Sequence, residues 1–152
     1  MNKKGVTLLE LIIVMVIIAI GATLVAPNIG QWLQHYRLRS ATRDIVSTMR
    51  TAQMRAVSTN MEHRVSFNNP VAGSYVLQRN SGGIWPNEGG PQTLPTGIVI
   101  SAVTFPVQDG WNNAEFNPNS TSSSGSVTLR NTKGSERRIV LTAATGRIRI
   151  EE

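Results

Sequence analysis

The sequence predicts an α+β protein in which one long N-terminal helix packs on a C-terminal antiparallel β-sheet domain. Three observations support this prediction. An apolar run covers residues 6–26, apolar residues at helical spacing continue to about Asn60, and short alternating runs separated by Gly, Pro and Asn fill the rest. At 152 residues the chain is long enough for one membrane-spanning segment and one modest folded domain.

The first element is the apolar run VTLLELIIVMVIIAIGATLVA, in which Glu10 is the only charged side chain. At 1.5 Å per residue a helix of this length reaches about 31 Å, enough to cross a bilayer core of about 30 Å. Lys3 and Lys4 precede the run, and basic residues favour the cytoplasmic side of a membrane. We therefore expect a single membrane span with its N-terminus in the cytoplasm.

Glu10 sets this run apart from an ordinary secretory signal, which has a shorter apolar region and a small-residue cleavage site at its end. A carboxyl group in a membrane helix is costly and normally has a partner and a function. The alternative is that Glu10 lies at headgroup depth.

The second element is an amphipathic continuation of the helix over residues 27–60. Pro27 removes a backbone donor and predicts a kink. The arginines of this segment are interpreted as a solvated or packing face. The apolar stripe predicted to face the core consists of Ile29, Leu33, Tyr36, Ala41, Ile45, Met49, Ala52 and Ala56.

The third element is a β-rich domain over residues 61–152. Alternating runs at residues 64–67, 75–78, 98–100, 114–116, 127–129, 138–141 and 147–150 predict antiparallel strands. Residues 80–97, rich in Gly and Pro, predict a long exposed loop, and residues 120–125 a flexible one.

Several classes of site are not expected. The chain has no cysteine, so it cannot form a disulfide, a thiolate nucleophile or a cysteine-ligated metal site. His35 and His63 are far apart and are expected to be surface or partly packed residues. No phosphate-binding glycine loop or nucleophile motif is present, so we expect no enzyme activity, no cofactor and no metal. The net charge of +6 suits an anionic partner or a merely soluble surface.

The residues Lys3-Lys4-Gly5, followed by Val6-Thr7-Leu8-Leu9-Glu10, resemble the leader of type IV prepilins and pseudopilins. This resemblance implies a leader at residues 1–5, cleavage between Gly5 and Val6 by prepilin peptidase, and N-methylation of Val6. It also implies that residues 6–26 form the transmembrane and filament-core helix, residues 27–60 its amphipathic continuation and residues 61–152 the globular head. The family usually has Phe or Met where this chain has Val6.

Glu10 has a role in filament assembly according to the same resemblance. Cleavage would create a cationic amine at Val6, and Glu10 of an adjacent subunit could compensate that charge in an apolar bundle. The implied location is the bacterial inner membrane, with a periplasmic head, followed by a pilus or pseudopilus filament. The implied partners are prepilin peptidase and other pilins or pseudopilins.

Three further features resemble the FimT/GspH branch of pilin-like proteins. They are Ala52-Gln53-Met54-Arg55-Ala56, then Phe116-Asn117-Pro118 with its Ser/Gly-rich sequel, and Arg137-Arg138-Ile139-Val140-Leu141 leading to Gly146-Arg147-Ile148-Arg149. The last four residues resemble the GRxR motif through which FimT-type minor pilins bind DNA.

Strand geometry supplies a mechanism for this motif. Gly146 permits a tight turn, and strand alternation then places Arg147 and Arg149 on one face, about 7 Å apart, which matches successive backbone phosphates. Arg130, Lys133, Arg137 and Arg138 could widen the patch. The alternative is that the arginines are solvated or paired with Glu136, Glu151 and Glu152.

The resemblance therefore implies a minor type IV pilin that binds extracellular DNA, without reading bases, for natural transformation. The alternative is a GspH-type minor pseudopilin at the tip of a type II secretion filament, which acts through contacts with other proteins.

Overall fold

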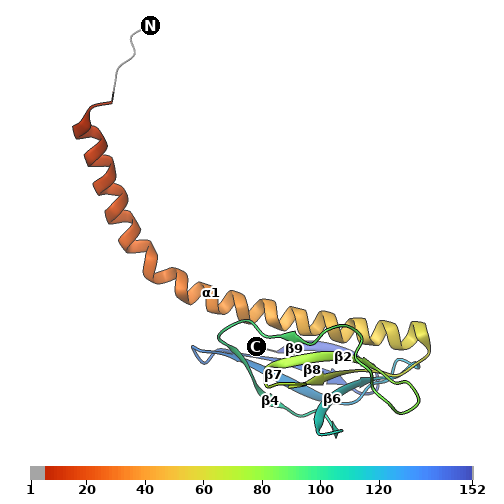
Figure 1. The fold of residues 1–152 in the computed structure, drawn as a ribbon. Helices are drawn as coiled ribbons and strands as arrows, with labels where there is room; N and C mark the ends of the chain where they lie inside the picture. The colour runs from red at the N-terminus through yellow and green to blue at the C-terminus, as the bar shows by residue number, and fades with distance from the viewer. Residues whose placement is uncertain (1–5, 152) are drawn as a thin grey trace. The chain divides into compact units, whose positions relative to one another are not determined.

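The structure, a computed structural model, describes residues 6–151, and within residues 24–31 it describes only the backbone (Figure 1). The chain divides into two compact units, Met1–Leu33 and Gln34–Glu152. We call the second unit the head domain. Helix α1 (Leu8–Thr59) supplies the helix of both units. Gly5 and the side chain of Pro27 lie outside the described residues, so the predicted cleavage and kink stay predictions.

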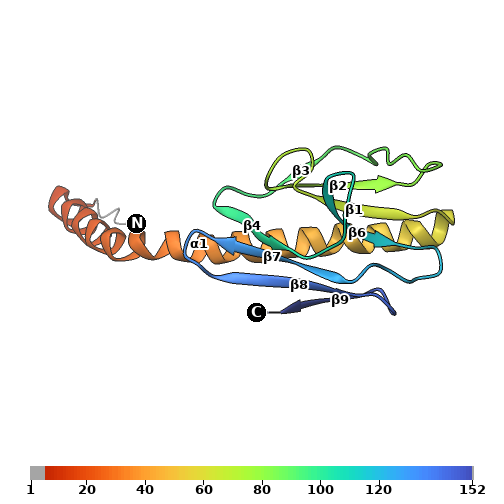
Figure 2. The ribbon, with the colours of Figure 1, turned by 90° about the horizontal axis from the view of Figure 1, so that it is seen from below.

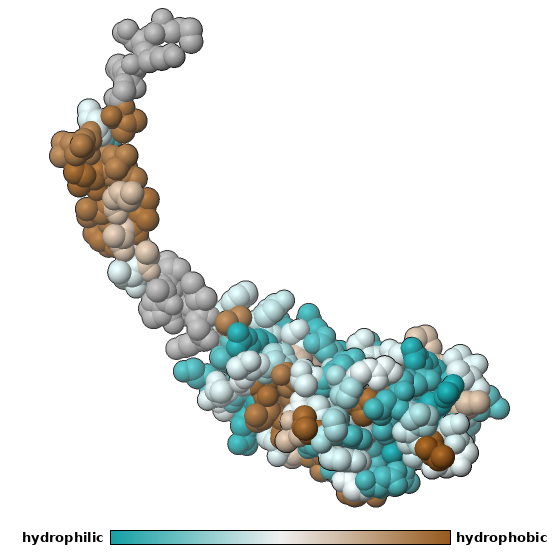
Figure 3. Space-filling model, viewed as in Figure 1, coloured by the Kyte–Doolittle hydropathy of each residue, from teal (hydrophilic) through white to brown (hydrophobic). Residues whose placement is uncertain are grey.

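In the first unit, α1 begins at a side-chain cap. The Oγ1 of Thr7 accepts a hydrogen bond from the backbone N–H of Glu10 at 3.3 Å, and the Thr7 carbonyl accepts one from the N–H of Leu11 at 3.2 Å. This is the Thr-x-x-Glu spacing of a capping box. The large apolar side chains that follow, from Leu8 to Ile20, are exposed and form a continuous hydrophobic surface (Figure 3).

Over the residues that the structure describes, no helix combines the length and hydropathy needed to cross a membrane. The span expected over residues 6–26 remains a prediction.

The end of α1 agrees closely with the sequence. The helix was expected to end near Asn60 and ends at Thr59. Asn60 adopts a left-handed conformation with φ of 54°, the conformation that commonly terminates a helix. The chain then enters the first strand of the head domain.

The head domain contains two antiparallel sheets beside the second half of α1 (Figure 2). One has the order β3-β2-β1-β6-β5 and the other β4-β7-β8-β9. The strands are β1 (His63–Phe67), β2 (Ser74–Arg79), β3 (Gln92–Thr93), β4 (Ile98–Val103), β5 (Val107–Gln108), β6 (Trp111–Phe116), β7 (Gly125–Asn131), β8 (Glu136–Thr142) and β9 (Arg147–Glu151). The predicted α+β class is confirmed, and the short strands β3 and β5 were not predicted.

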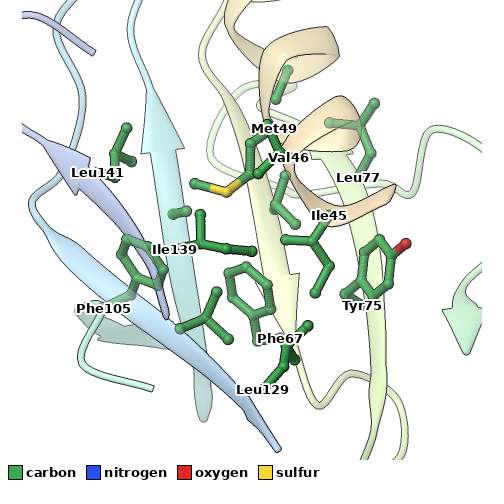
Figure 4. Packing of buried hydrophobic residues seen from close by; sticks show 14 of the residues in the cluster. Ile45, Val46, Met49, Phe67, Tyr75, Leu77, Phe105, Leu129, Ile139 and Leu141 are labelled. Carbon is green, nitrogen blue, oxygen red and sulfur yellow. The ribbon is translucent and has the colours of Figure 1, made fainter. Parts of the chain in front are cut away.

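One core lies between α1 and both sheets (Figure 4). Ile45 and Met49 of α1 are fully buried against residues from both sheets. The rings of Phe67 and Phe105 stack with centroids 5.5 Å apart. Every buried member of this cluster lies between Leu38 and Leu141, so the head domain contains a complete core of its own.

The predicted apolar stripe is partly correct. Ala41, Ile45, Met49, Ala52 and Ala56 are buried as expected, and Leu38 and Val46 join them. Tyr36, in contrast, is 58% exposed, so its assignment to the core was wrong. The reason is periodicity: the buried positions from Leu38 onward recur mainly at spacings of three and four, and Tyr36 falls two residues outside that series.

The segment 80–97, predicted to be a long exposed loop, is tied to the first sheet at several points. Trp85 lies over the guanidinium of the buried Arg64, 4.2 Å from the ring centroid to Cζ. Glu88 accepts a hydrogen bond from Arg55 at 2.6 Å and lies 3.3 Å from Nε2 of His63. His63 is fully buried, so the expectation of a surface or partly packed histidine was wrong. Local sequence did not reveal that this loop covers it.

Candidate nucleic-acid interface

The candidate interface includes the turn that leads into β9. Gly146 has φ of +57°, and a Cβ at this position would lie 3.0 Å from the carbonyl oxygen of Ser120 and closer still to the Gln53 side chain. Both the backbone conformation and the lack of space therefore favour glycine. The turn delivers Arg147 into register opposite Thr142, at the start of β9.

Pairing with β8 decides which way the β9 side chains face. Ile139 and Leu141 of β8 are buried, and their partners across the ladder are Ile150 and Ile148. Ile148 packs against the core. Because alternate residues of a strand face opposite sides, Arg147 and Arg149 point away from the core, and both are exposed. Strand alternation therefore places Arg147 and Arg149 on one face, as the sequence predicts, and their role in DNA binding stays a prediction.

The other predicted residues divide between the two faces and a turn. Arg138 lies opposite Glu151 and Arg130 opposite Glu136, and all four share the outward face with Arg147 and Arg149. Arg137 lies opposite the buried Leu129 and is therefore on the inward face. The structure thus separates Arg137 from Arg138, because neighbouring strand residues cannot share a face.

Lys133 is exposed in the turn between β7 and β8. Its backbone N–H donates to Oδ1 of Asn131 at 3.0 Å, which helps to close that turn. We use the name outer patch for Arg130, Arg138, Arg147 and Arg149.

Two glutamates lie among the arginines of the outer patch. Arg149 Nη2 is 3.3 Å from Glu151 Oε1, and Arg130 Nε donates to Glu136 Oε1 at 2.6 Å. The alternative, that the arginines of the patch pair with nearby acids, therefore holds for Arg149 and Arg130. Within residues 6–151 no acidic side chain forms an ion pair with Arg147. The patch keeps a positive excess, because four arginines face two glutamates.

Arg138 has a different neighbour. Its Nε donates to Oγ of Ser126 at 3.0 Å, and the two residues line a shallow cavity of about 380 Å³ on the outward face. This bond holds the guanidinium beside the ladder. The sequence motif carried no signal for Ser126, because it lies on β7 and reaches Arg138 only through the sheet.

Val6 and Glu10, predicted to act in processing and assembly, belong to the first unit, and Gly5 lies outside the described residues. The side chain of Val6 is 74% exposed and that of Glu10 is also exposed. Glu10 is the third residue of α1. Its backbone N–H donates a hydrogen bond to the capping Oγ1 of Thr7. The capping spacing was readable in the sequence and was missed.

Comparisons with known proteins agree with this architecture. Residues 41–146 match the family model described as type II transport protein GspH, and residues 1–26 match the prokaryotic N-terminal methylation motif. No curated protein sequence matches the chain.

Among solved structures, the fold is similar to that of the minor pseudopilin EpsH from the type 2 secretion system of Vibrio cholerae, with a TM-score of 0.61. The two share 8% sequence identity, and the match covers 76% of this chain and 96% of EpsH. A sequence identity this low supports similarity of fold and nothing further. The GspH family model, however, covers more than half of the chain. The chain therefore belongs to the GspH family of type IV pilin-like proteins.

Proposed function

We propose that this GspH-family protein is a minor type IV pilin that enters a pilus and binds extracellular DNA for uptake in natural transformation. The observation that carries the proposal is the outer patch. Arg147 and Arg149 are exposed on the outward face of β9, next to Arg138, and Arg147 has no acidic partner among the described residues.

The chemistry of the patch suits the phosphate backbone rather than the bases. Alternate residues of a strand lie about 7 Å apart, close to the separation of successive phosphates. Arginine forks bind phosphate oxygens through two N–H groups. The arginines project from the face of a sheet rather than from a helix that could enter a groove, so we expect binding without base readout.

Maturation and assembly form the second part of the proposal. Residues 1–5 are removed by prepilin peptidase, Val6 becomes the N-methylated first residue, and residues 6–26 hold the subunit in the inner membrane before assembly. Glu10 then compensates the N-terminal charge of a neighbouring subunit in the filament core. The match of residues 1–26 to the N-terminal methylation motif supports this part.

The alternative is a GspH-type minor pseudopilin at the tip of a type II secretion filament. The description of the family and the likeness to EpsH favour it. The ion pairs of Arg130 and Arg149 also favour it, because each leaves less positive charge for phosphate. Under this alternative the partners of the head domain are other pseudopilins.

DNA binding by the head domain, residues 34–152, separates the two functions. We expect binding that weakens steeply with salt and is similar for unrelated sequences. In the double variant Arg147→Gln/Arg149→Gln, the slope of log affinity against log salt should fall by about two units. The matched control Arg39→Gln/Arg43→Gln removes the same charge from α1 and should change the slope less. A wild-type head domain that does not bind DNA at low salt would favour the secretion function.

A further inference from the structure

The edge strand β9 offers a surface that the proposed function does not use. It is the last strand of its sheet, and among the described residues its ladder partner is β8 alone. Across residues 6–151, the backbone of residues 147–151 makes no hydrogen bond to a turn, a loop or α1. An exposed strand edge is a template for another strand, because alternate N–H and C=O groups along it are unpaired.

A groove lies beside this edge, between β9 and α1. Its volume is about 590 Å³. Val46, Met54 and Ile150 supply apolar surface, and Met54 and Ile150 are 65% and 41% exposed. The remaining lining residues are Arg43, Ser47, Arg50 and Thr51. A strand added to β9 would direct every second side chain toward α1 and into this groove.

The charges around the edge are mainly basic on both sides, with Glu151 beside Arg149 as the acidic exception on β9. Arg43 and Arg50 on α1 line the groove, and neither forms an ion pair among the described residues. Arg147 and Arg149 lie on the outward face of β9. An added strand would therefore meet guanidinium groups on either face.

We propose that β9 takes up an extended acidic segment of a partner polypeptide by antiparallel or parallel strand addition. The main chain of the segment pairs with the free edge of β9. Its outward side chains are carboxylates that face Arg147 and Arg149, and its inward side chains are apolar groups that contact Met54 and Ile150 between Arg43 and Arg50. The proposal goes beyond DNA binding, because it depends on the backbone of β9 and on the groove rather than on the outer patch alone.

A second copy of this chain fits the edge less well than an acidic partner. Antiparallel pairing of two β9 edges in the register that joins Arg147 to Glu151 of the other copy also places Arg149 opposite Arg149. Like charges directly opposite each other destabilise a strand pair. Shifting the register by two residues in one direction sets Arg147 opposite Arg149. Shifting it in the other direction sets Arg149 opposite Glu151 and removes the conflict, but only residues 149–151 of the two strands then pair, and Arg147 has no β9 residue opposite it. An acidic segment can pair with residues 147–150 without placing like charges opposite each other, and it meets a like charge only if it extends to Glu151.

The test uses the head domain and a short capped peptide that alternates glutamate and valine. We expect the peptide to bind and to slow amide hydrogen exchange in β9, because strand addition protects edge N–H groups. Two control peptides separate the contributions. One has the same sequence with N-methylated alternate amides, which cannot extend the sheet, and the other has lysine in place of glutamate. Neither should protect β9.

Protein variants test the groove independently of the outer patch. Arg43→Gln/Arg50→Gln should weaken binding of the acidic peptide by about tenfold, since two charge-assisted contacts are lost. Arg130→Gln removes a charge two strands away from the edge and should change the affinity less than about twofold. Neither substitution touches the core.

Four results would overturn the proposal. The first is equal binding of the N-methylated acidic peptide, which would show that charge alone suffices. The second is the absence of binding of the acidic peptide at low salt. The third is self-association of the head domain with protection of β9, which would assign the edge to a second copy. The fourth is equal protection of β9 by a DNA fragment. Loss of DNA binding in Arg147→Gln/Arg149→Gln would not contradict strand addition at β9. The experiments therefore test the DNA-binding proposal and the strand-addition proposal independently.

Discussion

Arg149 and Glu151 lie two residues apart on the outward face of β9 and form an ion pair with 3.3 Å between Nη2 and Oε1. The carboxylate neutralises one of the two arginines of the GRxR motif, while Arg147 has no acidic partner among the described residues. Glu151 therefore competes with any phosphate that approaches Arg149.

Replacing Glu151 by Gln should tighten DNA binding by the head domain about two- to fivefold, because an exposed ion pair contributes up to about 1 kcal/mol. The effect should be largest at low salt, where charges are screened least. Titration of labelled DNA measures it. The control Glu62→Gln removes the same charge from the junction of α1 and β1, outside the outer patch. Equal effects of both variants would mean that only net charge matters.

Gly146→Ala should lower the stability of the head domain by about 1–3 kcal/mol. Alanine strains the backbone at φ of +57°, and its Cβ meets Gln53 and the Ser120 carbonyl. The matched control is Gly134→Ala, at φ of +84° with no neighbour within 4 Å of the added Cβ. It bears the backbone strain without the contact. Thermal unfolding measures both, and equal losses would show that the contact with Gln53 has no effect.

Glu88 should make the stability of the head domain depend on pH. Burial acts to raise the pKa of this carboxyl, but the hydrogen bond from Arg55 and the charges of His63, Arg55 and Arg79 outweigh burial and hold the pKa below its ordinary value. A lowered pKa means that the stabilisation is present above the ordinary range near pH 4.3 and is lost as the pH falls through the folded-state value.

Glu88→Gln should therefore cost about 1 kcal/mol at pH 7, and the difference from wild type should shrink as the pH falls below about 4. Urea unfolding at several pH values measures this. Glu151→Gln is a suitable control, since Glu151 is exposed beside Arg149. A Glu88→Gln difference that stays constant down to pH 3 would contradict the ion-pair explanation.

Substitution of Glu10 distinguishes charge compensation from helix capping. Glu10→Ala removes both functions, whereas Glu10→Gln keeps a side chain suited to the capping box and loses only the charge. We expect both variants to insert into the membrane and both to fail in filament incorporation. Fractionation of sheared filaments measures incorporation. Normal incorporation of Glu10→Gln would show that the charge is not needed.

Gly5→Leu should block removal of the leader, because the small residue at the cleavage site fits the peptidase in the prepilins that this N-terminus resembles. Mass measurement of membrane-extracted protein reads the outcome directly. Uncleaved protein should retain residues 1–5. A mature mass for this variant would contradict the proposed processing, whereas Asn2→Leu, three residues upstream, should be cleaved normally.

The sequence by itself determined the features that depend on local spacing. The helical series from Ala41 to Ala56, the end of α1 and the runs that became the longer strands follow from the periods of 3.6 and 2.0 residues, which are properties of the backbone. The common face of Arg147 and Arg149 follows from the same alternation. These predictions needed no knowledge of which strands pair.

Only the tertiary structure decided the contacts between residues far apart in the chain. Sheet order made β9 an edge strand and set Ile150 beside a groove lined by Arg43 and Arg50. The fold also brought Glu88 to the buried His63, and the Gly146 turn against Gln53. Such contacts depend on the order and register of the strands, and packing of the whole core selects both. The local sequence pattern of a single segment therefore does not predict them.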